Sequence, residues 1–317
     1  DEAEILVRDG RLAELKQILS LQSAKEKEAI INQVYITETI GNIANDNIAL
    51  LHLAILLGHD EIATFLLSEC GAHVNVKTKT AQATPLLLAV RHKRNAIVET
   101  LLETYSANPN LNDYIRATPL MEACQAHSLE CVNLLLKHNA KIDQFDLHGF
   151  YPLRIAVQER QIELVRALIN AGANVNLRKS TERATCLIIA ASQNMENIVD
   201  LLLDAGAEVQ AKDEPRGFTA LHAAAAHGHL NIVKKFVERG ASIDEKTYFK
   251  QNTPLMEATF YGRYEVIEYL LSKGADCNAI KKNGRTPIFI AAKEGHLQVL
   301  KLLQAAGGNP CEAFEEV

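Results

Sequence analysis

The chain has 317 residues, of which 48% are hydrophobic but only 5% aromatic, and it contains no Trp. Its formal net charge of -6 argues against a dedicated nucleic-acid binder, a class that is usually strongly basic. No apolar run approaches the length of about 18 residues that a membrane-spanning helix needs, so we expect no membrane insertion. The six cysteines form no Cys-x-x-Cys pair, and reduced thiols in a cytoplasmic protein are the simplest interpretation.

The first segment, residues 1–19, looks like a shortened copy of a unit that recurs later. Gly10 corresponds to a glycine of the first full unit, and Leu15 and Leu19 have the spacing of an apolar helix face. Glu14 places a charge on that same face. A terminal unit needs a polar outer face to remain soluble, so we expect an N-terminal cap here.

Residues 20–48 form an insertion between this cap and the first full unit. Ser23-Ala24-Lys25-Glu26 matches the capping box that begins a helix. Two interpretations remain open, a local embellishment that shields the first unit and an element that confers binding specificity.

The insertion also has a candidate surface to cover. Leu56 and Leu57 are apolar at positions where most other units are polar. Adjacent exposed leucines are a liability unless they are covered or used in binding. We therefore expect the insertion to fold over them, through Ile43 or Ile48.

From residue 49 onward, a unit built around Thr-Pro-Leu-x-x-Ala recurs eight times. The first positions, spaced by 33 to 35 residues, are Ala49, Thr84, Thr118, Tyr151, Thr185, Thr219, Thr253 and Thr286. A Thr can cap the first N–H groups of a helix, and Pro is tolerated at its first position. A second apolar stripe follows in each unit and predicts a second helix. A glycine then ends that helix in the left-handed conformation, as at Gly172, Gly206, Gly240 and Gly274.

This unit resembles the ankyrin repeat over residues 49–310. The resemblance implies an all-α repeat solenoid in which each helix-turn-helix carries a β-hairpin finger. We expect about eight full repeats and the N-terminal capping repeat in a single domain, 1–317, with a tail at 311–317. Gln304 replaces the last apolar residue of the final repeat, which suggests a nearly complete array. The start at Asp1 rather than Met suggests a piece of a longer protein.

The histidines predict structural roles rather than catalysis. His52 and His222 occupy the His position of the Thr-Pro-Leu-His motif, where the resemblance implies a hydrogen-bonded link between turns. His59, His229 and His296 each follow a glycine between two helices. No phosphate-binding loop or nucleophile motif is present. We expect no enzyme activity, no metal and no cofactor.

The resemblance implies binding through the fingers and the concave groove, and we expect the main contact on the sixth and seventh full repeats. The scarce aromatic residues converge there, and such residues, together with Arg, tend to dominate interface energy. The predicted partner-binding residues are Arg216, Phe218, His227, Tyr248, Phe249, Phe260 and Tyr261. A secondary set consists of Arg91, His92, Tyr114, Arg116, Phe150 and Arg183.

The expected partner is another protein or peptide, bound by a monomeric chain acting as a scaffold, adaptor or targeting domain. Several fingers are basic, most clearly at Lys281, Lys282 and Arg285, which favours a partner with an acidic segment. The alternative is a substrate-receptor or regulatory segment of a larger enzyme, of a ligase complex or of a host-directed effector.

Overall fold

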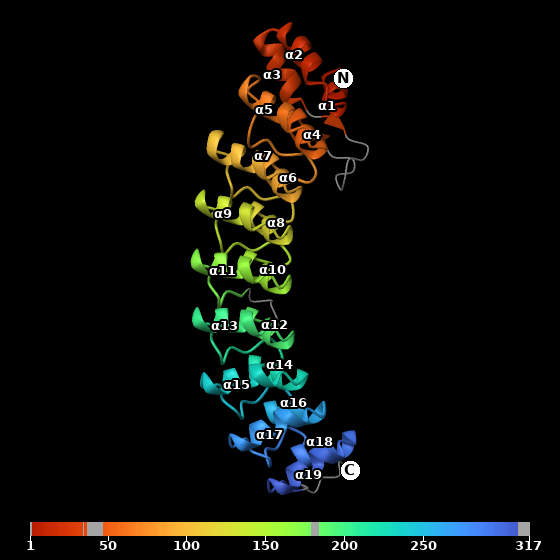
Figure 1. The fold of residues 1–317 in the computed structure, drawn as a ribbon. Coiled ribbons are helices and arrows are strands. Elements are labelled where there is room, and N and C mark those ends of the chain that lie inside the picture. The colour runs from red at the N-terminus through yellow and green to blue at the C-terminus, as the bar shows by residue number, and fades with distance from the viewer. Residues whose placement is uncertain (1, 34, 37–46, 179–183, 310–317) are drawn as a thin grey trace. The chain divides into compact units, whose positions relative to one another are not determined.

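The computed structural model describes residues 2–33, 35–36, 47–178 and 184–309. The chain divides into two units, residues 1–173 and 174–317, each of which is described by itself. Within each unit, short helices follow one another in pairs (Figure 1). Ile43, one of the residues expected to cover Leu56 and Leu57, lies outside the described residues, as does the predicted site residue Arg183.

The first unit begins with three helices and a minimal antiparallel sheet, in which Tyr35 pairs with Ile48 and Ile36 with Asn47. Its elements are α1 (Glu2–Arg8), α2 (Leu12–Ser20), α3 (Ala24–Asn32), β1 (Tyr35–Ile36), β2 (Asn47–Ile48), α4 (Leu50–Leu57), α5 (Asp60–Ser68), α6 (Pro85–Arg91), α7 (Asn95–Glu99), the π-helical turn η1 (Thr100–Thr104), α8 (Pro119–Gln125), α9 (Leu129–Lys137), α10 (Pro152–Gln158) and α11 (Ile162–Asn170).

The second unit contains only helix pairs and their connecting turns in its described part. Its elements are α12 (Cys186–Ser192), α13 (Glu196–Asp204), α14 (Ala220–His227), α15 (Leu230–Glu238), α16 (Pro254–Phe260), α17 (Tyr264–Ser272), α18 (Pro287–Glu294) and α19 (Leu297–Ala305). Together with the first unit, the pairs from α4–α5 to α18–α19 match the eight repeats expected from the sequence, and α1–α2 matches the expected cap.

The recurring Thr begins the first helix of most repeats, as predicted. Its hydroxyl accepts a hydrogen bond from the backbone N–H three residues later, at Thr84, Thr118, Thr185, Thr219 and Thr253. Such a cap satisfies one of the N–H groups that the helix itself leaves unpaired. The predicted glycine stops are also confirmed, since Gly172, Gly206, Gly240 and Gly274 all have positive φ.

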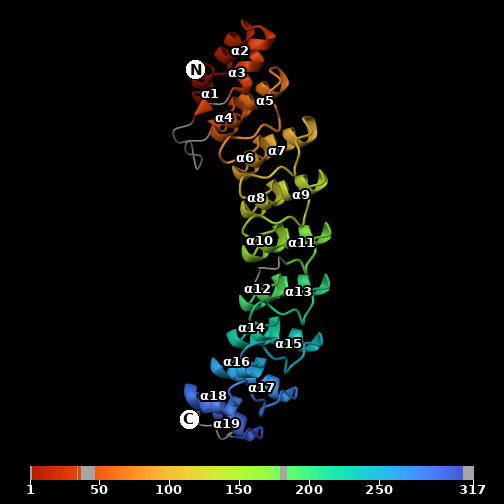
Figure 2. The same ribbon diagram turned by 180° about the vertical axis from the view of Figure 1, so that it is seen from behind.

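The core of each unit lies between neighbouring repeats. First helices contact first helices, as α14 does with both α12 and α16, and second helices form a parallel row beside them (Figure 2). Leu255 and Ala258 of α16 and Ile267 and Leu270 of α17 are fully buried. Burial of the Leu and Ile side chains contributes about 1.5–3 kcal/mol each, so each repeat depends on its neighbours for its stability.

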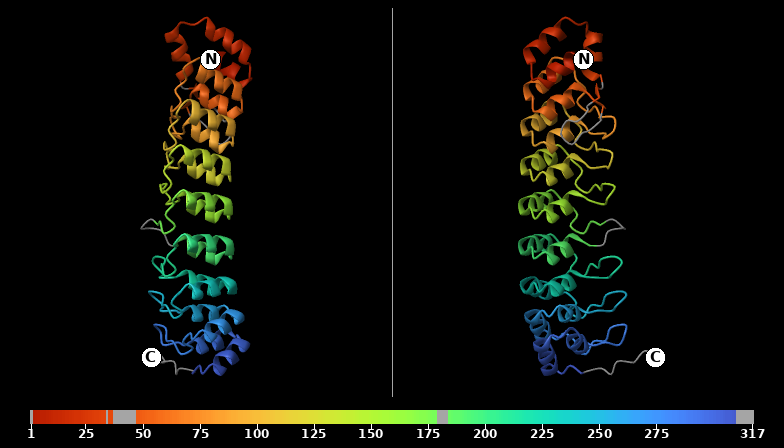
Figure 3. Two further views of the ribbon diagram at one scale, coloured as in Figure 1. Left: turned by 60° about the vertical axis from the view of Figure 1, so that its left-hand side comes forward. Right: turned by 90° about the vertical axis from the view of Figure 1, so that its right-hand side faces the viewer.

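The loops that precede the first helices project to one side of the helix pairs (Figure 3). Where the structure describes them, these loops are tight hairpin-like turns rather than pairs of strands, since β1 and β2 are the only strands of the described residues. One backbone hydrogen bond joins successive fingers, for example Tyr248 N–H to the Arg216 carbonyl at 3.0 Å and Lys282 N–H to the Lys250 carbonyl at 3.1 Å. These bonds hold the side chains of adjacent fingers in fixed register.

The N-terminal cap and the first helix of the insertion, α3, are described by the structure. Leu15 and Leu19 are buried on the inner side of α2, and α1 packs against α4. The capping box is confirmed: the Ser23 hydroxyl accepts from Glu26 N–H, and the Glu26 carboxylate accepts from Ser23 N–H. Helix α3 contacts α4, whereas the covering of Leu56 and Leu57 by the rest of the insertion stays a prediction.

Candidate functional site

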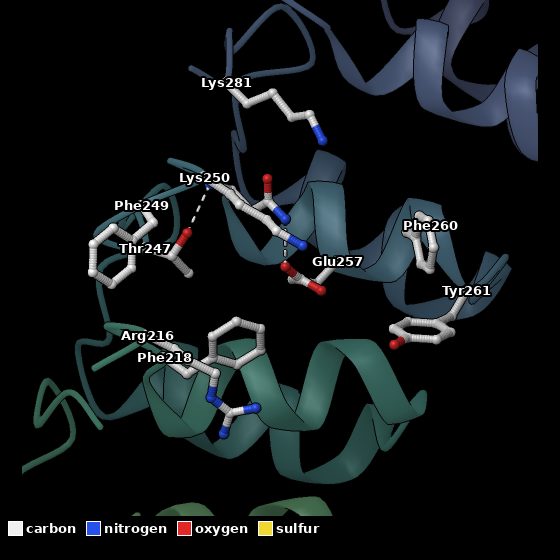
Figure 4. Close-up of a pocket in the computed structure, with 10 residues that line it drawn as sticks. Arg216, Phe218, Thr247, Phe249, Lys250, Glu257, Phe260, Tyr261 and Lys281 are labelled. Atoms are coloured by element: carbon white, nitrogen blue, oxygen red, sulfur yellow. Dashed lines mark hydrogen bonds between the residues drawn. The ribbon is translucent and has the colours of Figure 1, made fainter. Parts of the chain in front are cut away.

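The second unit contains a pocket of about 300 Å³ between the sixth and seventh full repeats. Two neighbouring fingers and helix α16 supply most of its walls, and the next finger adds one lysine (Figure 4). The lining residues are Arg216, Phe218, Thr247, Phe249, Lys250, Asn252, Glu257, Phe260, Tyr261 and Lys281. We call this the aromatic–lysine pocket.

The first wall is a finger organised by Asp213, whose side chain is fully buried. The Asp213 carboxylate accepts from the backbone N–H of Phe218 at 2.6 Å and from the Arg216 guanidinium at 2.6 and 2.9 Å. The Arg216 guanidinium in turn lies 4.9 Å from the centre of the Phe218 ring, within the range of a cation–π contact. One buried carboxylate therefore fixes both the cation and the ring of this wall.

The second wall is the finger from Thr247 to Asn252. Thr247 N–H donates to the Asn252 carbonyl at 3.0 Å, and Asn252 N–H donates to the Thr247 hydroxyl at 2.9 Å. The buried His222 of the previous repeat also donates from Nε2 to the Asn252 carbonyl at 3.1 Å. Asn252 is thus held from two repeats, and its side chain reaches the floor of the pocket.

Aromatic side chains dominate the rim. Phe249, Phe260 and Tyr261 remain 63%, 47% and 51% exposed, which is unusual for rings that could pack inside. The Phe260 and Tyr261 rings meet edge to face with their centres 5.0 Å apart. Exposed rings held rigidly in this way can bury much area on binding at little entropic cost.

Glu257 forms the floor and is the one acidic residue that lines the pocket. Its carboxylate accepts from Asn252 Nδ2 at 2.7 Å. Burial raises the pKa of Glu257, while the Asn252 hydrogen bond and the charges of Lys250, Lys281 and Arg216 act in the opposite direction. Burial and the neighbouring cations Arg285 and Lys250 lower the pKa of Lys281. The pocket therefore combines a buried anion with an excess of cations nearer its mouth.

Of the seven residues predicted for the main contact, five line the aromatic–lysine pocket and two do not. Tyr248 lies outside it, with the Lys212 ammonium 5.0 Å from the centre of its ring. His227 donates from Nδ1 to the Ala223 carbonyl and stacks against the His229 ring, 5.7 Å between centres. Both residues have local structural partners, so the structure brings together a smaller set than the sequence suggested.

The described residues of the secondary set lie in the first unit and have varied surroundings. Arg91 is bound by the buried Glu122 and lies 3.5 Å from Asp113, and burial lowers the pKa of His92. Arg116 occupies a turn position with a φ of 65°. Tyr114 remains 64% exposed. Phe150 lies under the Arg154 guanidinium.

Sequence reasoning missed Thr247, Lys250, Asn252 and Glu257 as pocket residues, and it named Lys281 only as a basic finger residue. One signal was available, because the string Thr-Pro-Leu-Met-Glu-Ala occurs twice, at 118–123 and 253–258. A glutamate at the same buried position of two repeats points to a feature beyond ordinary repeat packing. The two lysines carry no such signal, since lysine is common in exposed fingers.

The histidines have the structural roles expected of them. His52 and His222 link to the carbonyls of Val76 and Asn252, 3.1 Å in each case. His59, His229 and His296 reach the carbonyls of Arg8, Ser192 and Phe260 at the end of the preceding repeat's first helix. In the described part of the chain, no three His, Cys, Asp or Glu side chains are grouped so that they could hold a metal ion.

None of the described helices has the length and apolar character needed to cross a bilayer. The longest of these helices have nine residues, and each helix packs against a neighbouring helix through its buried apolar side. The apolar residues of these helices therefore serve packing between repeats.

Comparison with known proteins gives matches along most of the chain. The family profile described as "Ankyrin repeats (3 copies)" matches residues 22–113, 86–179, 153–247, 187–281 and 245–313. The ankyrin repeat protein nuc-2 of Neurospora crassa is 30% identical over 125 residues, which cover 39% of this chain and 12% of that protein. Human Rabankyrin-5 is 32% identical over 155 residues, which cover 48% of this chain and 13% of that protein.

The ankyrin repeat domain of human ASB11 is similar in structure. Its TM-score is 0.60 at 26% sequence identity, and the match covers 70% of this chain and 98% of that domain. The chain spans only about an eighth of the length of the two sequence relatives named above. The recurring helix pairs, the Thr caps and these matches show that the chain belongs to the ankyrin-repeat family, whose repeats generally act as protein–protein interaction modules.

Proposed function

We propose that the chain is a protein-interaction module, a scaffold, adaptor or targeting domain, which binds a partner protein through the aromatic–lysine pocket and the adjacent fingers. The observation that carries this proposal is the cluster of exposed rings around one hollow, Phe249, Phe260 and Tyr261. The whole chain has only nine Phe and eight Tyr. Aromatic side chains that frame a pocket are typical of binding hot spots. We assign no catalytic role to these residues.

Charge at the mouth of the pocket favours acidic residues in the bound segment. Lys250, Lys281 and Lys282 border a second hollow next to Phe249. No ion pair holds any of these three ammonium groups within the described residues. Complementary charges accelerate association and reject partners of the wrong sign. We expect the affinity to fall as salt increases, because exposed charges are screened.

The test is to capture partners with the wild-type chain, identify them, and measure their affinity by calorimetry for wild type and for the double variant Phe260→Ala, Tyr261→Ala. We expect a loss of at least about 2 kcal/mol if the two rings are hot spots. Leu297→Ala, which removes an exposed apolar side chain of α19 that belongs to neither predicted set, is the control and leaves the affinity unchanged. An unaltered affinity in the double variant contradicts the proposed site.

A substrate-receptor or regulatory segment of a larger assembly is the second candidate. One match bears on it: human ankyrin repeat and SOCS box protein 16, 34% identical over 77 residues that cover 24% of this chain and 17% of that protein, combines ankyrin repeats with a further element, the SOCS box. Both candidates use the same surface. They differ in whether the captured partner is released intact or is modified in an assembly that contains the chain, which a reconstituted assay would distinguish.

A further inference from the structure

The two copies of Thr-Pro-Leu-Met-Glu-Ala place a glutamate in the same position of two different repeats. Glu122 and Glu257 are each the fourth residue after the capping Thr, and each is 7% exposed. A buried carboxylate requires a cation or several hydrogen-bond donors to offset the loss of water. The two copies meet this requirement in different ways.

Glu122 is neutralised by its own chain. Arg91, which stands 31 residues earlier in the preceding repeat, donates from Nε to Oε2 at 3.1 Å and from Nη2 to Oε1 at 2.6 Å. This is the two-pronged arrangement in which a planar guanidinium matches a carboxylate. Arg91 lies in the groove seven residues after Thr84.

Glu257 has no such partner. The residue 31 positions earlier is Ala226, whose methyl group supplies no donor. Asn252 Nδ2 donates the one hydrogen bond that the Glu257 carboxylate accepts in the described structure. The acceptor oxygen of the same amide, Asn252 Oδ1, is buried without a hydrogen-bond partner. The Glu257 carboxylate thus has one amide donor where Glu122 has a two-pronged guanidinium, and an unmet buried acceptor such as Asn252 Oδ1 costs about 1–3 kcal/mol.

The chain's own cations do not fill this place. Arg216 is bound to Asp213, and no ion pair joins Lys250 or Lys281 to Glu257 among the described residues. The hollow remains open where the Arg91 side chain lies in the other copy. Its walls are rings, Phe218 on one side and Phe260 and Tyr261 on another (Figure 4).

We propose that the aromatic–lysine pocket takes an arginine side chain from the partner protein, whose guanidinium binds the Glu257 carboxylate between the rings, as Arg91 binds Glu122 within the chain. This proposal rests on the proposed function, because it specifies what enters that same surface. Arginine fits better than lysine because its planar fork donates in two directions and stacks on aromatic faces. Lys250, Lys281 and Lys282 then face acidic residues that flank the arginine in the bound segment.

The experiment uses the full chain and three probes, the Nα-acetyl amides of arginine, lysine and glutamate. Each is titrated to millimolar concentrations while the side-chain amide signals of Asn252 are followed by nuclear magnetic resonance. The arginine derivative shifts these signals and saturates, the lysine derivative binds more weakly, and the glutamate derivative leaves them in place. No response to the arginine derivative, or an equal response to the glutamate derivative, overturns the proposal.

Two variants sharpen the test. Ala226→Arg supplies the missing guanidinium within the chain, and Glu257→Gln removes the carboxylate, so each weakens arginine binding at least about tenfold. Ser192→Arg is the matched control, because it adds the same side chain at the same helix position one repeat earlier, opposite Ala223 instead of a glutamate. It leaves arginine binding unchanged. Arginine binding that persists undiminished in Glu257→Gln also overturns the proposal.

The two proposals fail separately. If partner affinity falls in the Phe260→Ala, Tyr261→Ala variant but is unaffected by Glu257→Gln and Ala226→Arg, the surface is correct and the arginine anchor is wrong. If the affinity of a captured partner is unaffected by all these changes, the proposed surface itself is wrong.

Discussion

The buried imidazole of His222 donates from Nε2 to the backbone carbonyl of Asn252 in the next repeat, at 3.1 Å, while its Nδ1 lies 3.3 Å from the N–H of Thr219. This arrangement requires the neutral ring, because Nδ1 must accept. Burial accordingly lowers the pKa of His222 to about 4. The same histidine joins two repeats and supports the finger that carries Asn252.

Protonation of His222 should therefore destabilise the fold at mildly acidic pH. The folded-state pKa is depressed below the unfolded value of about 6.5, so the stability is complete above that value and is lost as the pH falls toward 4. We expect the free energy of unfolding to fall by about 2 kcal/mol between pH 7.5 and 5 through this residue. Urea denaturation at several pH values measures it. His222→Asn removes this part of the pH dependence, whereas the exposed His148→Asn retains it.

Replacement of Glu122 or Glu257 by glutamine should change the free energy of unfolding differently. Glu122→Gln weakens a buried, two-pronged ion pair with Arg91, and we expect the free energy of unfolding to decrease by about 2 kcal/mol. Glu257→Gln removes a buried carboxylate that lacks an ion pair in the described structure, so stability is unchanged or increases by up to about 1 kcal/mol. Chemical denaturation at pH 7 compares them. Equal losses in both variants would contradict the difference that we draw between the two repeats.

Much of the fold could be predicted from the sequence because each element repeats. The Thr caps and the glycine stops depend on local geometry, and many copies in register make each local preference visible. The histidine links join residues 24 or more positions apart and were expected from the resemblance to the ankyrin repeat. Ser23 and Glu26 show that a single capping box can be read correctly even outside the repeats. The division of the chain into two units, residues 1–173 and 174–317, has no comparable local signal in the sequence.

The site was less predictable because its chemistry depends on residues in different repeats. The aromatic rim follows from composition, since rings are rare in this chain. The role of Glu257 at the floor of the pocket does not follow from composition. Glu257 lacks the arginine partner that Glu122 has, because the residue 31 positions earlier is Ala226. Tyr248 and His227 were predicted from their positions, but their side chains have partners nearby, Lys212 and Ala223.

Removal of the insertion should expose apolar surface at the N-terminal end. Ile31 of α3 is fully buried, and α3 contacts α4, the helix that carries the half-buried Leu56 and Leu57. We expect deletion of residues 24–42 to increase the fluorescence of a hydrophobic dye or to promote self-association. Light scattering and dye titration measure both effects. A deletion variant that remains monomeric with unchanged fluorescence rejects the covering role.

Substitution of Gly217, in the finger that carries Phe218, should be more destabilising than substitution of another glycine with positive φ. Gly217 and Gly240 both have positive φ, 75° and 82°. A Cβ on Gly217 would lie 2.6 Å from Cγ and 2.7 Å from the backbone N of Tyr248, whereas a Cβ on Gly240 meets nothing within 4 Å. Gly240→Ala therefore incurs the left-handed backbone strain alone, about 1 kcal/mol.

Gly217→Ala should add a steric clash to that strain and lower the free energy of unfolding by about 3 kcal/mol. The clash also pushes apart the fingers that the Tyr248 N–H to Arg216 carbonyl bond joins. Phe218 and Phe249 stand on these two fingers, so partner affinity should fall in Gly217→Ala even at temperatures where the variant is fully folded. Gly240→Ala lies at the end of α15, away from the pocket residues, and should bind as wild type does. Calorimetry on both variants decides the matter, because equal affinities would mean that the spacing of these fingers does not shape the binding surface.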